Sequence, residues 1–153
     1  MRGEMSKSEK ARALFCSGAN CAQSVVGTFH KECGLDYETA MRLSSGFGAG
    51  MGRLREVCGA VSGMFMVVSL KSGNSDLKDK AAKDAHYALI QKLAGRFKAE
   101  TGSIICRELL GLDGKSPDSP VSEARTQDYY QRRPCAELVA LATKILDEHL
   151  NGQ

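Results

Sequence analysis

The sequence contains no tryptophan and only three prolines among its 153 residues, and it has no long hydrophobic run. The longest apolar stretch, Val61 to Leu70, is interrupted by Ser62, Gly63 and Ser69. A helix that crosses a bilayer needs about 20 apolar residues, so we expect no membrane span. The scarcity of proline, together with many Ala, Leu, Lys and Glu residues, favours helices.

A strong excess of charge of one sign is also missing. The formal net charge is +3, and the lysines and arginines are spread among acidic residues. This pattern lacks the basic patch that nucleic-acid binding requires, so we expect no nucleic-acid partner. Arg53 with Arg55, and Arg132 with Arg133, could hold an anion, although solvated surface is the expected reading of both pairs.

The first ten residues are polar and lack the apolar segment of a secretory signal. A cytoplasmic protein is therefore the expectation. In such a reducing compartment, cysteines rarely form structural disulfides. The chain nevertheless has six cysteines, for which metal binding, redox chemistry or plain burial remain as explanations: Cys16, Cys21, Cys33, Cys58, Cys106 and Cys135. No two of them have the CxxC spacing of zinc ribbons or thioredoxins.

The apolar spacing predicts an all-α protein, a compact bundle of about five to seven helices in a single domain over residues 1–153, with its core at about 11–150. The two helices expected at its centre begin at Cys58 and at Ser75 or Asp76. Residues 113–133 are expected to be irregular. The other predicted helices cover residues 6–15, 21–33, 36–43, 103–110 and 135–150.

Glycine occurs at every second position from Gly46 to Gly52. Such a segment allows a close approach to the main chain. It is either a loop that wraps a ligand or a tight connection between helices, and the sequence favours neither reading.

Three cysteines fall at predicted helix N-termini: Cys21 after Asn20, Cys58 at the start of its helix, and Cys135 after Pro134. A helix N-terminus supplies free amide donors and a partial positive charge, which stabilise a thiolate. Thiolate is the form that binds metals and attacks disulfides. For Cys16 and Cys33, burial as small apolar residues is the expected reading.

The order of these motifs resembles a family of redox-active proteins known by its C_GCAxxG_C_C signature. The resemblance lies in Asn20–Val25, the glycine-rich segment, Cys58–Gly63, and then Cys106 and Cys135, and it covers roughly residues 11–150. It implies that the family's four cysteines are Cys21, Cys58, Cys106 and Cys135. Related domains in multihaem cytochromes suggest an iron–sulfur cluster, but no haem-attachment motif is present here.

Three functions follow as alternatives. The first is an electron-transfer or redox-sensing protein whose four cysteines hold an iron–sulfur cluster, with Gly48 and Gly50 beside it. The second is a metal-free thiol–disulfide protein, and the third is a helical interaction module stabilised by zinc. The first two imply a redox partner protein, and a homodimer is left open.

Overall fold

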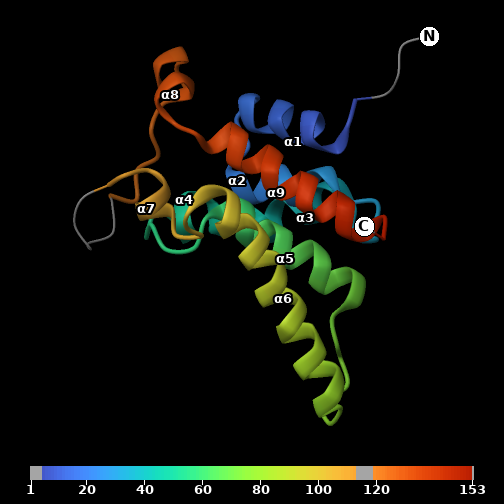
Figure 1. The fold of residues 1–153 in the computed structure, drawn as a ribbon. Helices are drawn as coiled ribbons and strands as arrows, with labels where there is room; N and C mark the ends of the chain where they lie inside the picture. Colours follow the sequence, from blue (N-terminus) through green and yellow to red (C-terminus); the bar gives the residue numbers. More distant parts are fainter. Residues whose placement is uncertain (1–4, 113–118, 153) are drawn as a thin grey trace.

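The computed structural model describes residues 5–112 and 119–152 (Figure 1). Within these residues the chain is helical, and the only β-type pairing is an isolated bridge between Val57 and Ile105. The elements are α1 (Lys7–Cys16), α2 (Cys21–Thr28), α3 (Tyr37–Ser44), the 3-10 helix η1 (Ser45–Phe47), α4 (Gly48–Met51), α5 (Gly59–Ser72), α6 (Lys80–Thr101), α7 (Cys106–Leu109), α8 (Gln127–Arg132) and α9 (Cys135–Leu150).

The prediction of an all-α bundle is confirmed. Among the described residues, six helices are eight residues or longer, namely α1, α2, α3, α5, α6 and α9. None of the described helices has the length and apolar character needed to cross a bilayer.

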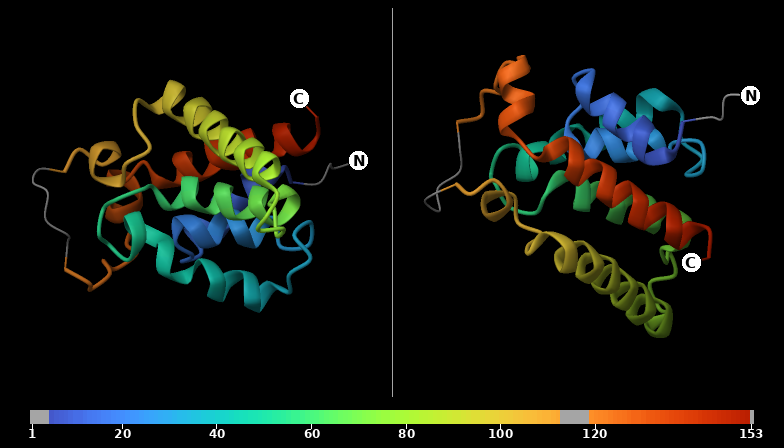
Figure 2. Two further views of the ribbon diagram at one scale, coloured as in Figure 1. Left: turned by 90° about the horizontal axis from the view of Figure 1, so that it is seen from below. Right: turned by 45° about the horizontal axis from the view of Figure 1, so that its top comes forward.

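The core lies where α1, α2, α5 and α9 pack together (Figures 1 and 2). Helices α2 and α5 approach closely because α5 has glycine where it meets α2. A Cβ atom added to Gly63 would lie 3.0 Å from the Ala22 carbonyl oxygen and 3.0 Å from the Val25 Cβ. Small residues on one helix thus set the distance between the two backbones.

The local start signals in the sequence are confirmed at α2. The Asn20 side chain accepts a hydrogen bond from the Gln23 amide at 2.8 Å, and the Gln23 side chain accepts one from the Asn20 amide at 3.0 Å. This reciprocal capping box fixes the first turn of α2. The helix itself ends at Thr28, earlier than the predicted end near Cys33, and turns follow it to Gly34.

The prediction for α6 was wrong in its start and in its place in the bundle. The helix begins at Lys80, after the Asp79 side chain accepts a hydrogen bond from the Ala82 amide. The C-terminal end of α5 and the N-terminal half of α6 extend away from the other helices (Figure 1), and most residues from 70 to 88 are exposed. The physical reason is that the predicted apolar stripe has only alanine in the first turns of α6. These turns therefore have little apolar surface to bury against the other helices.

The segment 113–133 was predicted to be irregular. Residues 113–118 lie outside the described residues, but residues 127–132 form the short helix α8. Its N-cap is Thr126, whose hydroxyl accepts a hydrogen bond from the Tyr129 amide at 3.1 Å. The sequence signal for this helix was therefore a threonine cap rather than an apolar stripe.

The α6 stripe offers a matched test of the core. We expect Leu93→Ala to lower the free energy of unfolding by about 2–5 kcal/mol, because Leu93 is fully buried. Leu77→Ala should change it by less than about 0.5 kcal/mol, because Leu77 is 87% exposed. Urea titration followed by circular dichroism measures both. Equal losses in the two variants would contradict this packing of α6.

Candidate four-cysteine site

Four cysteines from four separate segments line one cavity of about 250 Å³. They are Cys21, Cys58, Cys106 and Cys135, and between 4% and 8% of each residue is exposed. The cavity lies at the end of the bundle where α4 and α7 are found (Figure 1). Its volume far exceeds the roughly 10–15 Å³ that a single water molecule needs.

Each of the four cysteines stands at the start of a helix. Cys21, Cys106 and Cys135 are the first residues of α2, α7 and α9, and Cys58 is the N-cap of α5. The sequence predicted this position for three of them, but it placed Cys106 inside a helix that began at Ser103. That helix starts later because the Ser103 hydroxyl accepts a hydrogen bond from the Ile105 amide at 3.0 Å.

Backbone pairing brings Cys58 and Cys106 together. The Cys58 amide donates to the Ile104 carbonyl at 2.7 Å, and the Cys106 amide donates to the Glu56 carbonyl at 2.6 Å. These bonds join the extended residues before α5 to those before α7. Two cysteines 48 positions apart in the sequence therefore reach the same wall of the cavity.

The glycine-rich segment forms a tight left-handed turn on another part of this wall. All described non-glycine residues with positive φ lie in it or within three residues after it: Ala49, Met51, Arg53 and Arg55, with φ between 55° and 71°. Gly48 and Gly50 also line the cavity. The segment is thus both a connection between helices and a part of the cavity wall. A role of Gly48 and Gly50 in holding a cofactor stays a prediction.

Cys21 and Cys135 are joined in the cavity by a hydrogen bond between their side chains. The hydrogen bond from the Cys21 thiol lowers the pKa of Cys135, and Arg133, Arg125 and Arg55 lower it further by their charge. The same hydrogen bond raises the pKa of Cys21, and burial raises it further. Cys135 is therefore the one cysteine of the four whose pKa is lowered.

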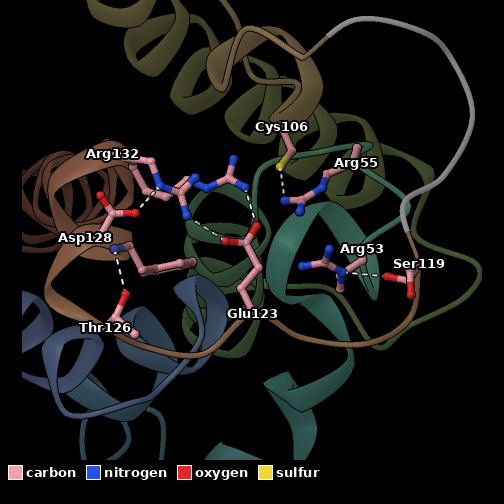
Figure 3. Close-up of polar contacts among 10 residues, drawn as sticks. Arg53, Arg55, Cys106, Ser119, Glu123, Thr126, Asp128 and Arg132 are labelled. Carbon is pink, nitrogen blue, oxygen red and sulfur yellow. Dashed lines mark hydrogen bonds and ion pairs between the residues drawn. The ribbon is translucent and has the colours of Figure 1, made fainter.

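The other two thiols remain protonated near neutral pH. Burial raises the pKa of Cys58 to about 12, although the amides of Ala60 and Val61 at the start of α5 act in the opposite direction. Burial also raises the pKa of Cys106. Arg55 opposes this rise, since its Nη1 donates a hydrogen bond to the Cys106 sulfur at 3.6 Å (Figure 3).

The sequence did not predict arginines beside the cysteines, although it named two arginine pairs that could hold an anion and preferred solvated surface for both. Arg53, Arg55, Arg125 and Arg133 all line the cavity. The expected solvated surface is wrong for Arg55, which is 4% exposed, and for the Arg133 side chain, which is 12% exposed and ion-paired with Glu123. No spacing rule singles out Arg125, because it reaches the cavity through contacts with residues more than 100 positions away.

The two additional cysteines do not line the cavity. Cys16 is exposed, so its expected burial is wrong, and Cys33 is partly exposed. Within residues 5–112 and 119–152, no three His, Cys, Asp or Glu side chains are placed closely enough to form a metal-binding group. The four cavity sulfurs thus share a space without forming a closed set of ligands.

The thiol pKa values predict an order of reaction in metal-free protein. At pH 7 iodoacetamide should alkylate Cys135 well before Cys58, because thiolate is the reacting form and the pKa of Cys58 is about 12. Peptide mass spectrometry after timed quenching measures both residues. The free energy of unfolding should fall as the pH rises from the ordinary thiol pKa of about 8.5 toward 12. Over this range Cys58 loses its proton in the unfolded chain but keeps it in the folded chain. Equal labelling of both residues at pH 7 would contradict these assignments.

Comparison with known proteins identifies the family of the chain. No curated protein and no solved structure matches the chain significantly. Residues 19–149, which include all four cavity cysteines and the left-handed turn, match the family described as "Putative redox-active protein (C_GCAxxG_C_C)". Because the match covers most of the chain, this protein belongs to the C_GCAxxG_C_C family of redox-active proteins.

Proposed function

We propose that this redox-active protein transfers or senses electrons through an iron–sulfur cluster held by Cys21, Cys58, Cys106 and Cys135. The observation that carries the proposal is that these four buried cysteines line a single cavity. Four thiolates are the ligand set of [2Fe–2S] and [4Fe–4S] clusters. A thiol–disulfide protein would need only two of them.

The four cysteines fit such a cluster because they are of the ligand type it uses, because there are four of them, and because all four line the same cavity. As placed, no three of them form a closed metal-binding group. Binding would therefore require the cysteine side chains to draw together around the metal. When bound, the cluster would supply reversible one-electron chemistry.

The chain's own residues would control the properties of this site. Arg55 donates a hydrogen bond to the Cys106 sulfur, and hydrogen bonds and positive charge at a ligand sulfur favour the reduced state. The buried helix starts at Cys21 and Cys135 exclude bulk water while offering amide groups and a positive dipole end. A redox partner protein would then exchange electrons at this end of the bundle. A cytoplasmic location and a homodimer stay predictions.

A specific observation favours a second candidate, a metal-free dithiol made by Cys21 and Cys135. Their hydrogen bond lowers the pKa of Cys135 and raises that of Cys21. Oxidation of the pair in its one-proton form, a Cys135 thiolate beside the Cys21 thiol, would form one S–S bond and release two electrons and one proton. The electrons would pass to a disulfide of a partner molecule, which would be reduced to two thiols with that proton and one from the solvent.

Analysis of protein purified without oxygen separates these functions. We expect a brown protein that contains iron and acid-labile sulfide and absorbs in the visible range. Colourless protein with stoichiometric zinc would instead indicate a structural Cys₄ zinc site. Protein that holds no metal after reconstitution with iron and sulfide, and that forms a Cys21–Cys135 disulfide in air, would establish the dithiol and overturn the cluster.

A further inference from the structure

Arginine is the main charged residue type among the described residues that line the four-cysteine cavity. Among the described residues that line it, four are arginines and one, Glu123, is an acid. Glu123 is already ion-paired with Arg132 at 3.0 Å (Figure 3) and with Arg133 at 2.5 Å. It is therefore already engaged and is not a partner of Arg125.

Arg125 is a cation of the cavity wall that has no carboxylate partner among the described residues. Its guanidinium donates to the Phe15 carbonyl at 3.0 Å, to the Ala19 carbonyl at 2.9 Å and to the Tyr130 hydroxyl at 3.3 Å. All three acceptors are uncharged. In the described part of the chain, no carboxylate lies within ion-pairing distance of Arg125.

The surroundings of Arg125 strengthen the attraction of its charge for an anion. The group is partly buried and lies over the Phe15 ring, 4.4 Å from its centroid. A guanidinium has five N–H donors, so the three acceptors leave two for a ligand. Removal of water from a charged group is costly, and an anion in the cavity would offset that cost.

We propose that this cavity binds a small anion, a carboxylate or an inorganic oxyanion, beside the cysteines, with Arg125 as its anchor. The inference deepens the proposed function, on which it rests, because it names the chemical class of small molecule that reaches the redox site. A neutral molecule of the same size could accept hydrogen bonds from the guanidinium but would lack the charge attraction. The cavity of about 250 Å³ has room for such an ion.

Alkylation by two reagents that differ in charge tests the proposal on the full-length, metal-free chain. Iodoacetate and iodoacetamide share a leaving group and nearly the same size. For each cysteine, the ratio of the two rates cancels the reactivity of the thiolate itself. Cys33, which lies outside the cavity, is the internal reference. We expect this ratio at Cys135 to exceed that at Cys33 by about 10-fold or more at low salt, and to fall as salt is added.

Variants identify the anchor. Arg125→Gln should lower the normalised ratio several-fold, and Arg125→Lys should retain most of it because the charge is kept. Arg12→Gln is the matched control, since Arg12 is ion-paired with Glu137 and does not line the cavity. If Arg125→Gln does not fold, the salt dependence of the wild-type ratio still decides the question.

A protection experiment distinguishes the two kinds of anion. Succinate or inorganic phosphate should slow the reaction of Cys135 with iodoacetamide, whereas uncharged succinamide should not. The better protector identifies carboxylate or oxyanion. A normalised ratio near one that does not change with salt, or equal protection by succinamide, would overturn the proposal. Because no metal is present in these experiments, their outcome is separate from that of the cluster analysis.

Discussion

Gly50→Ala should lower the free energy of unfolding by about 2–5 kcal/mol. Gly50 has φ +71°, and a Cβ atom there would lie 2.6 Å from the Arg55 Cα and 2.7 Å from the Cys106 Cβ. Left-handed backbone costs an L-residue about 1–2 kcal/mol, and overpacking adds about 1–3 kcal/mol. Urea titration of the metal-free protein measures the loss.

Gly46→Ala is the matched control within the same glycine-rich segment. Nothing lies within 4 Å of a Cβ atom at Gly46, and its backbone is not left-handed. We expect a change within about 1 kcal/mol, because the alanine is accommodated and restricts the unfolded chain. The strain at Gly50 comes from the wall that carries Cys106, so its alanine variant should also alter the reaction rate of that thiol. If both glycine variants were equally stable, the close approach of Gly50 to Cys106 would be wrong.

Cys58→Ser should remove most of the iron and of the visible absorbance from protein purified without oxygen. An alcohol oxygen is a poor substitute for a thiolate, because iron–sulfur clusters favour soft sulfur ligands. The fold should survive the change, since Cys58 is the N-cap of α5 and serine is among the best residues there. Iron and sulfide analysis, with circular dichroism as the folding check, measures the result.

Cys16→Ser is the control for this loss. Cys16 is exposed and lies outside the cavity, so its replacement should leave the iron content unchanged. A dithiol made by Cys21 and Cys135 would also be insensitive to Cys58→Ser and would still form its disulfide. Iron retained in full by Cys58→Ser would therefore show that Cys58 is not a ligand.

Local signals in the sequence predicted most of the helices. A capping box spans four residues and an apolar stripe repeats over three or four, so both can be read without knowing the fold. The start of α2 after Asn20 is confirmed in this way. The start of α6 was missed because Asp76 and Asp79 are both cap residues, and only the backbone turn of residues 74–79 decides between them.

The sequence by itself determined the helical class, and the resemblance to the family indicated which four cysteines form the candidate site. The tertiary structure alone decided that they share one cavity, and that arginines surround it. Arg55 meets Cys106 across 51 positions, and Arg125 meets Phe15 across 110. Such contacts leave no periodic pattern in the chain, because they depend on how whole helices pack rather than on neighbouring residues.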